Sequence, residues 1–273
     1  MKVAVVQMSP VLKDKELNRA AMIRGVKAAA SNGPHLVVFP ECALTGYMME
    51  SAAEALSVGE TVPGPSTEVF RDLCARTDSY VIFGLIEKDG EKLYNTAVLV
   101  GPEGVVGRHR KAHLVRVAVD SFVTPGQHLE VFEIRGIRIG LLICYEIRFP
   151  EASRVLALKG AQMIVVIANW PMGAEVNPNI MVPARAAENH VYVLGANRSG
   201  KEGTLSFIGN SVIYDPNGSL LCKASKEETV LKADLDLQKG GLQKVDVSLS
   251  GYCVDLTGHR RPELYGILGE SQG

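Results

Sequence analysis

The chain has 273 residues, of which 47% are hydrophobic and 22% are charged. This composition is typical of a soluble globular protein and excludes a largely disordered chain. Lys and Arg together number 29 and Asp and Glu 30, so the balance of charge does not favour binding to nucleic acid or to an anionic membrane. A small molecule is therefore the expected partner.

Short apolar runs alternate with helical patterns along the chain, which predicts an α/β protein. Gly-containing turns between residues 93 and 144 are typical of hairpins, so mixed sheets are expected. No linker or repeat interrupts the pattern, which predicts a single domain over residues 1–273. Strands are expected at residues 3–7, 36–39, 80–87, 93–100, 105–109, 129–134, 137–144, 163–168, 191–196, 211–215, 220–224 and 229–234, and helices at residues 17–30, 66–76, 152–159 and 181–189.

The first ten residues contain no signal-peptide core, and no apolar run reaches the roughly 20 residues that a membrane helix needs. We therefore expect a cytoplasmic protein. The cysteines are odd in number and lack Cys-x-x-Cys spacing, which favours free thiols over a disulfide framework or a structural zinc site. They are Cys42, Cys74, Cys144, Cys222 and Cys253.

Glu41 follows the apolar strand expected at residues 36–39 and is separated from it only by Pro40. Reacting groups of α/β proteins lie where strands end. A carboxylate near apolar surroundings has a raised pKa, which suits it to act as a general base near neutral pH. An N-cap or a salt-bridged turn residue is the structural alternative for Glu41.

Cys144 ends the strand expected at residues 137–144 and precedes a charged segment and a helix. At such a turn, helix-end amides can lower the thiol pKa and hold a developing oxyanion. A buried structural cysteine is the alternative. The other four cysteines lack this setting and are interpreted as structural.

Lys111 belongs to the basic cluster Arg108-His-Arg-Lys-Ala-His-Leu114 at the end of another expected strand. The cluster alone fits a solvated turn or a phosphate-binding patch. The sequence contains no Gly-rich phosphate loop, which disfavours the phosphate interpretation and leaves Lys111 available for another role.

Together these segments resemble the nitrilase superfamily of carbon–nitrogen hydrolases, whose members place a Glu, a Lys and a Cys in this order. The resemblance extends in order along nearly the whole chain. It includes Phe39-Pro-Glu-Cys-Ala-Leu-Thr-Gly-Tyr47, Arg110-Lys-Ala-His113, Phe122-Val-Thr-Pro-Gly126, Ile143-Cys-Tyr-Glu-Ile-Arg-Phe-Pro-Glu151, Ala168-Asn-Trp-Pro171, Ala184-Arg-Ala-Ala-Glu-Asn189, Asn197-Arg198, Asp215-Pro-Asn-Gly218 and Arg260-Arg-Pro-Glu-Leu-Tyr265.

The resemblance implies a four-layer α-β-β-α sandwich of two stacked mixed sheets. Members of the superfamily usually associate through a helix-covered face, so a homodimer or a higher homo-oligomer is expected. The C-terminal segment, about residues 250–273, is expected to extend over that interface. The resemblance implies no metal and no organic cofactor.

The resemblance also implies a division of chemical roles. Glu41 is the expected general base and acid, and Cys144 is the expected nucleophile. Lys111 and the backbone N–H of Tyr145 are the expected oxyanion stabilisers. The further expected substrate contacts are Tyr47, Asp120, Tyr145, Asn169 and Trp170. Core packing is the alternative for Tyr47 and Trp170.

One segment departs from the family pattern. Many relatives carry a second Glu shortly before the Phe-x-x-Pro-Gly segment, where it positions the Lys and the substrate. Here Asp120 is the only carboxylate in that stretch, and its side chain is shorter. Asp120 either takes over that role or is a turn residue that caps the local backbone.

Tyr145 follows the nucleophile, whereas true nitrilases typically have Trp at that position. The segment therefore favours the amidase, ω-amidase and carbamoylase branches, and the expected reaction is hydrolysis of a small linear amide to acid and ammonia through a cysteine thioester. Hydrolysis of an N-carbamoyl amine or of a nitrile are the enzymatic alternatives. A catalytically silent oligomeric binding protein is the alternative of another class.

Overall fold

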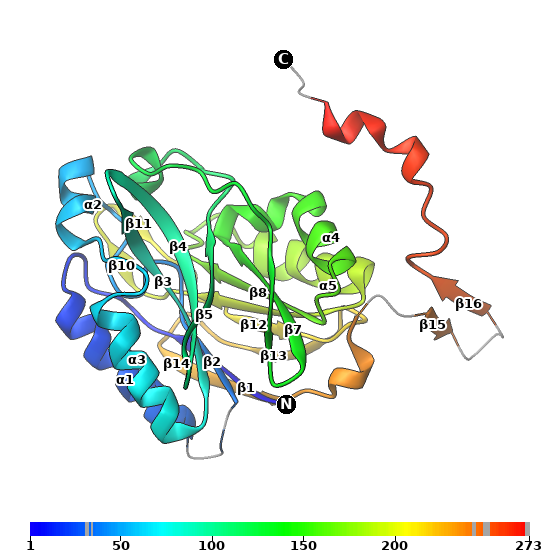
Figure 1. Cartoon of the computed structure of the whole chain (residues 1–273), viewed down its shortest axis with the longest axis horizontal. Helices are drawn as coiled ribbons and strands as arrows, with labels where there is room; N and C mark the ends of the chain where they lie inside the picture. Colours follow the sequence, from blue (N-terminus) through cyan, green and yellow to red (C-terminus); the bar gives the residue numbers. More distant parts are fainter. Residues whose placement is uncertain (31–32, 34, 242–243, 248–251, 271–273) are drawn as a thin grey trace.

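The computed structural model describes residues 1–30, 33, 35–241, 244–247 and 252–270. Its body contains two six-stranded sheets (Figure 1). The first has the order β14-β1-β2-β3-β4-β5, with β1 at Lys2–Gln7, β2 at Leu36–Val38, β3 at Tyr80–Asp89, β4 at Lys92–Gly101, β5 at Gly104–Arg110 and β14 at Thr229–Asp234. The second has the order β13-β12-β9-β8-β7-β6, with β6 at Val131–Ile134, β7 at Ile137–Ile143, β8 at Met163–Ala168, β9 at Tyr192–Asn197, β12 at Val212–Tyr214 and β13 at Leu220–Lys223.

Both sheets are mixed, as predicted. In the first sheet β1, β2 and β3 pair in parallel, and in the second sheet β7, β8 and β9 do so, while the outer strands pair antiparallel. Two small hairpins are formed by β10 (Lys201–Glu202) with β11 (Leu205–Ser206) and by β15 (Lys244–Val247) with β16 (Tyr252–Asp255).

Helices cover the outer face of each sheet (Figure 1). α1 (Lys15–Ala30) and α3 (Pro65–Thr77) lie on the first sheet, and α4 (Pro150–Leu158) and α5 (Val182–Asn189) lie on the second. The remaining helices are α2 (Ala52–Val58), the π-helix η3 (Asn177–Met181) and the 3₁₀ helices η1 (Ala118–Ser121), η2 (Cys144–Arg148), η4 (Leu237–Lys239), η5 (Pro262–Leu264) and η6 (Gly266–Gly269). The four-layer α-β-β-α sandwich is thereby confirmed.

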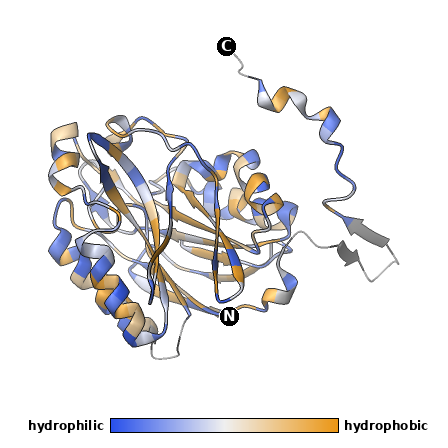
Figure 2. Cartoon of the chain, viewed as in Figure 1, coloured by the Kyte–Doolittle hydropathy of each residue, from blue (hydrophilic) through white to orange (hydrophobic). Residues whose placement is uncertain are grey.

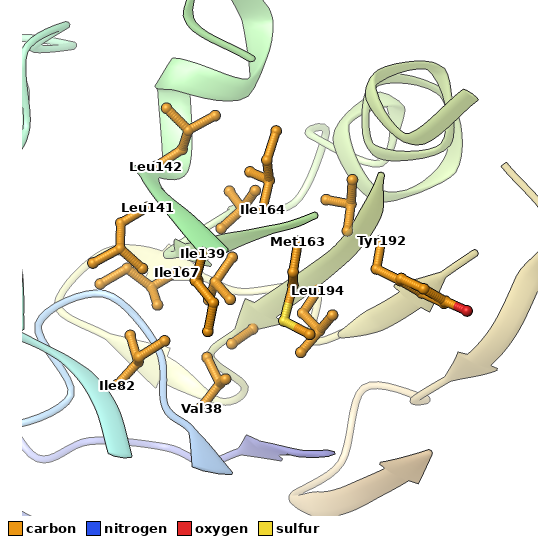
Figure 3. Close-up of a cluster of buried hydrophobic side chains, with 14 of the residues drawn as sticks. Val38, Ile82, Ile139, Leu141, Leu142, Met163, Ile164, Ile167, Tyr192 and Leu194 are labelled. Carbon is orange, nitrogen blue, oxygen red and sulfur yellow. The ribbon is translucent and has the colours of Figure 1, made fainter. Parts of the chain in front are cut away.

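One core cluster lies between the two sheets. It includes Val38 of β2 and Ile82 of β3 from the first sheet, together with Ile139, Ile167 and Leu194 from the second (Figure 3). Every residue of β2 and β8 is buried, because each of these central strands is covered on both faces. This position explains why their sequences are continuous apolar runs rather than alternating ones.

A second core cluster lies between the first sheet and its helices. Met22 and Val26 of α1 and Phe70 and Leu73 of α3 share it with Phe83 of β3. The hydrophilic residues of these helices lie on the side away from the sheet (Figure 2). The burial of one helical stripe explains the apolar spacing that predicted both helices.

Several features differ from the predicted elements, and three of them have a clear physical reason. β7 ends at Ile143 rather than at Cys144, because Cys144 has a φ of 52°, which is incompatible with a strand. α2 was not predicted; it is only seven residues long and is capped by Ser51, whose side chain accepts a hydrogen bond from the Glu54 N–H. The β10–β11 hairpin was not predicted either, since two-residue strands have no readable period.

The C-terminal segment leaves the body beside the second sheet (Figure 1). Of the expected interface segment 250–273, residues 252–270 are described. Arg260, Tyr265 and Leu268 line a cavity of about 320 Å³ together with Arg154 of α4. No helix in the described ranges has the length and apolar character needed to cross a membrane.

Candidate active site

Glu41, Lys111 and Cys144 each follow the end of a strand. Lys111 comes directly after β5 and Cys144 directly after β7, while Glu41 lies three residues beyond β2. β2 and β5 belong to one sheet and β7 to the other, so the site forms where the two layers meet. Glu41 and Lys111 are fully buried, and Cys144 is 9% exposed.

Two glycines allow the backbone to approach these residues closely. The Gly84 N–H of β3 donates to Pro40 O at 3.1 Å, and a Cβ on Gly84 would meet the Glu41 Cα at 2.7 Å. The Gly126 N–H donates to Lys111 O at 2.9 Å, and a Cβ there would meet the carbonyl oxygen of the preceding residue at 2.0 Å. Any larger residue would displace the backbone of Glu41 or Lys111.

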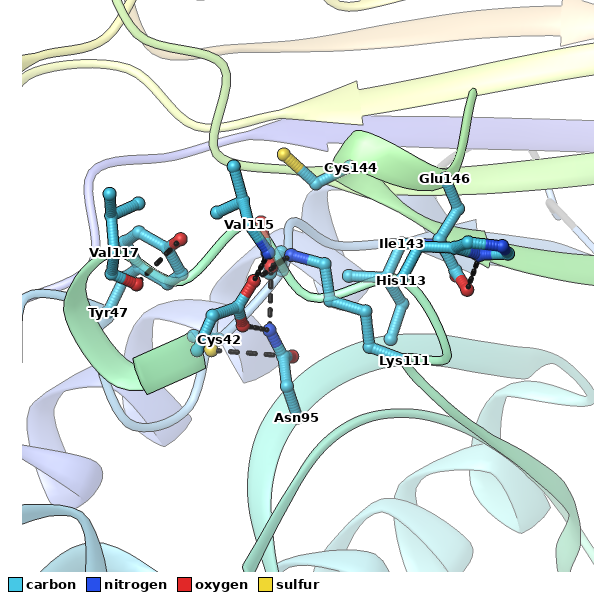
Figure 4. Close-up of polar contacts among 12 residues, drawn as sticks. Cys42, Tyr47, Asn95, Lys111, His113, Val115, Val117, Ile143, Cys144 and Glu146 are labelled. Atoms are coloured by element: carbon cyan, nitrogen blue, oxygen red, sulfur yellow. Dashed lines mark hydrogen bonds and ion pairs between the residues drawn. The ribbon is translucent and has the colours of Figure 1, made fainter. Parts of the chain in front are cut away.

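Four side chains form a closed ring of hydrogen bonds (Figure 4). Lys111 Nζ donates to Glu41 Oε1 at 2.8 Å and to Asp120 Oδ2 at 2.6 Å. Asn95 Nδ2 donates to Glu41 Oε1 at 2.7 Å and to Asp120 Oδ1 at 2.9 Å. The solvated turn is therefore excluded for Lys111, and Asp120 is buried beside it rather than exposed in a turn.

The ring sets the ionisation of its members. Burial raises the pKa of Glu41, although Lys111 acts in the opposite direction. Burial lowers the pKa of Lys111, but its charged neighbours, Glu41 first among them, hold that pKa well above its usual value. Lys111 is thus a fixed cation. Among the described residues, the second oxygen of Glu41, Oε2, has no hydrogen-bond partner.

The pKa of the Cys144 thiol is raised, whereas the sequence predicted that helix-end amides would lower it. Burial raises it most and Glu41 adds to the rise, while Lys111 and a hydrogen bond from the Asn169 backbone lower it only partly. The thiol is therefore protonated at neutral pH. A nucleophile in this state needs a neighbouring base to accept its proton during attack, and the free oxygen of Glu41 can supply one.

Asn95 was not among the predicted site residues. It lies in β4 between Tyr94 and Thr96 and is fully buried. A buried amide in an apolar strand requires hydrogen-bond partners, and this was the signal that could have identified it. The partners could not be predicted from the sequence of β4 alone, because they are brought close by strand pairing. The pairing of β4 with β5 places the Lys111 N–H 2.8 Å from Asn95 O.

Two of the predicted aromatic contacts, Tyr47 and Trp170, are buried. The Tyr47 hydroxyl donates to Val117 O at 3.4 Å, and burial raises the pKa of Tyr47 well above its usual value. Trp170 Nε1 donates to Cys144 O at 3.5 Å, and its ring belongs to the core between the sheets. Trp170 therefore supports the nucleophile turn from the core side.

Asn169 and Tyr145 occupy contrasting environments. Asn169 is 3% exposed, and neither Oδ1 nor Nδ2 has a hydrogen-bond partner in the part of the chain that the structure describes. Tyr145 is 37% exposed and packs edge-on against Phe149.

In the part of the chain that the structure describes, no three His, Cys, Asp or Glu side chains are arranged to hold a metal ion.

The comparisons with known proteins agree with this geometry. A family model described as carbon-nitrogen hydrolase matches residues 2–244. A nitrilase of Pyrococcus abyssi is 40% identical over 240 residues, which cover 87% of this chain and 90% of that protein. An omega-amidase of Danio rerio is 34% identical over 290 residues, which cover 100% of this chain and 99% of that protein.

A solved structure is similar over nearly the whole length. It is a mutant of the amidase from Nesterenkonia sp. AN1 that shows covalent addition of the acetamide moiety of fluoroacetamide at its active-site cysteine. The TM-score is 0.81 at 25% identity, covering 97% of this chain and 95% of that chain. The chain therefore belongs to the carbon–nitrogen hydrolase family of the nitrilase superfamily.

Proposed function

We propose that the chain hydrolyses a small linear amide to a carboxylic acid and ammonia through a thioester on Cys144. One observation carries the proposal. Lys111 and Asn95 hold Glu41 Oε1, whereas Oε2 is buried without a partner among the described residues. A buried carboxylate with one free oxygen is suited to accept a proton. The relatives named amidase and omega-amidase support an amide as the substrate.

In the first half of the reaction, Glu41 takes the thiol proton as the sulfur of Cys144 attacks the amide carbonyl carbon. Lys111 Nζ and the Tyr145 N–H stabilise the oxyanion of the tetrahedral intermediate. Glu41 returns the proton to the nitrogen as the C–N bond breaks. Ammonia leaves, and the acyl group remains as a thioester.

In the second half, Glu41 removes a proton from water, which attacks the thioester carbonyl carbon. The same two donors stabilise the second oxyanion. The C–S bond then breaks, the acid leaves, and the sulfur of Cys144 recovers its proton. One amide and one water thus give one acid and one ammonia, and the enzyme is unchanged.

We infer that Asp120 supports Lys111 in place of the second Glu of the family. Its Oδ2 accepts the Lys111 ammonium at 2.6 Å and also the Val115 N–H at 3.3 Å. It therefore fixes Lys111 to the segment beside the nucleophile. This arrangement compensates for the shorter side chain, because η1 begins at Ala118 and carries Asp120 inward.

We infer that the substrate amide contacts Asn169. A buried amide side chain without partners costs stability, and a substrate offering both an acceptor and a donor would satisfy it. A primary amide has both groups. Tyr47 and Trp170 are proposed to lie behind the substrate-binding space, since their polar atoms contact the segments around Val117 and Cys144.

An ammonia-release screen over short amides, ω-amides, N-carbamoyl amines and nitriles tests this function. Short amides should give ammonia and acid without carbon dioxide, whereas N-carbamoyl amine hydrolysis would give carbon dioxide as well. Nitriles form the second candidate class, because the Pyrococcus abyssi relative is named a nitrilase. A folded protein that released ammonia from none of these compounds would support the silent binding protein instead.

We also propose that the chain is a homo-oligomer in which the C-terminal segment covers a second copy. Leu264, Ile267 and Leu268 are each 63% exposed on η5 and η6, which lie beyond the body (Figure 1). A contiguous group of exposed large apolar side chains favours association.

We also propose a cytoplasmic location. Four described cysteines are unpaired, as expected in a reducing compartment, and the side chain of Cys253 lies outside the described part.

The oligomer can be tested with the double variant Ile267→Asp/Leu268→Asp. Two carboxylates in an apolar interface should dissociate the assembly, so light scattering should give the mass of a monomer. Leu56→Asp is the matched control, because Leu56 is 48% exposed on α2 and lies outside the segment. An unchanged mass for the double variant would show that this segment does not form the interface.

A further inference from the structure

Glu146 lies two residues after the nucleophile, and its carboxylate makes four hydrogen bonds. Figure 4 shows Glu146 beside two of these partners, His113 and Ile143. Oε2 accepts from the Ile143 N–H at 2.8 Å and pairs with His109 Nε2 at 2.7 Å. Oε1 accepts from the Ala112 N–H at 2.9 Å and pairs with His113 Nδ1 at 3.4 Å. The side chain is fully buried, so these contacts are shielded from solvent.

The two backbone partners flank the catalytic residues. Ile143 immediately precedes Cys144 at the end of β7, and Ala112 immediately follows Lys111 beyond β5. β7 and β5 belong to different sheets. One carboxylate therefore joins the two layers at the points where the nucleophile and the oxyanion-binding ammonium leave them.

The four contacts require an ionised carboxylate. Burial acts to raise the pKa of Glu146, but the charge and hydrogen bond of His109, the bond from His113 and the Ala112 N–H together hold that pKa well below its usual value. Each oxygen faces a backbone N–H, so both must be acceptors. An amide side chain offers only one acceptor and would leave one of the two backbone N–H groups facing an NH₂ group.

We propose that Glu146 is a positioning residue that fixes the Lys111 ammonium relative to the Cys144 sulfur by bracing the backbone on both sides of the site. The inference rests on the function proposed above. Lys111 must meet the oxyanion at hydrogen-bond distance while the sulfur meets the carbonyl carbon. A displacement of about 1 Å between such groups lowers turnover on the order of 10²-fold.

The test compares kcat and KM for ammonia release from a short amide in three variants. Glu146→Gln should lower kcat on the order of 10²-fold with KM within about twofold, because the fault lies in transition-state geometry rather than in substrate contacts. Glu146→Asp keeps two acceptor oxygens but is shorter, so its kcat should fall only about tenfold. Glu60→Gln is the matched control, since Glu60 is buried, accepts from the Ser66 N–H at 2.9 Å and pairs with Lys15 at 3.1 Å rather than with the residues beside Lys111 and Cys144; its kcat should be unchanged.

The order of the two variants decides between bracing and packing. Gln is closer to Glu in size, so a residue that only fills space would make Glu146→Gln at least as active as Glu146→Asp, and this order would overturn the inference. If the Gln protein does not fold, a kcat of Glu146→Asp within about twofold of wild type would overturn it. Wild type and Cys144→Ala are measured in the same series. If wild type is active and the Glu146 variants have the same kcat, only the positioning role of Glu146 is wrong. If wild type is inactive, both the proposed function and that role are wrong.

Discussion

Replacing Cys144 with alanine is expected to lower ammonia release by a factor on the order of 10⁵–10⁶, because it removes the sulfur that forms the acyl-enzyme. The fold should survive, since the change removes one sulfur atom at the cost of about 1 kcal/mol in the free energy of unfolding. Steady-state ammonia release and thermal unfolding of the purified variant measure the two effects separately.

Cys74→Ala provides the matched control. Cys74 of α3 is also buried, and its Sγ donates to Val100 O at 3.6 Å in the core between α3 and the first sheet, remote from the ring around Lys111. Its removal should lower stability to a similar extent and leave turnover intact. Full activity in a folded Cys144→Ala protein would contradict the covalent mechanism.

Lys111→Met is expected to affect both stability and turnover. Removing the cation leaves Glu41 and Asp120 buried without their partner, which should cost about 3–5 kcal/mol of unfolding free energy. Loss of an oxyanion donor should lower kcat by a further factor of about 10²–10³. Chemical denaturation and ammonia release check these two expectations.

The same variant should shift the pH dependence of its remaining activity. Burial raises the pKa of Glu41, and the charge of Lys111 opposes that rise. Without Lys111 the pKa of Glu41 therefore lies higher than in the wild type. Glu41 acts as a base only when ionised, so the acid limb of the pH–rate profile should move to higher pH.

A double variant separates the two consequences of losing Lys111. Adding Asp120→Asn neutralises one of the two unpaired carboxylates, so Lys111→Met/Asp120→Asn should recover part of the lost stability. It should not recover turnover, because the oxyanion still lacks its donor. A Lys111→Met protein as stable as the wild type would show that the ring does not hold ionised groups.

The sandwich could be predicted from the sequence because its central strands are long apolar runs. β8 was predicted with its observed bounds, Met163–Ala168, since every residue in it is buried. The short elements were missed where local signals are weak. α2 and the β10–β11 hairpin are stabilised by contacts with distant parts of the chain, as when Glu202 of β10 accepts the Tyr47 N–H at 3.0 Å.

The proposed catalytic residues could be recognised only as an ordered set. Glu41, Lys111 and Cys144 each had a structural alternative, and their common order supported the family. Their support could not be predicted, because Asn95 and Glu146 act through partners far away in the sequence. The thiol pKa was predicted in the wrong direction because the turn suggested helix-end amides, whereas burial and Glu41 dominate.

Peptide mapping by mass spectrometry, after an acid quench during turnover of a short primary amide, tests the thioester most directly. We expect the peptide that contains Cys144 to gain the mass of the substrate's acyl group during turnover and to lose it when the amide is exhausted. Ammonia release at an undiminished rate with Cys144 unmodified at every quench time, or an acyl group on another residue that turns over instead, would contradict it.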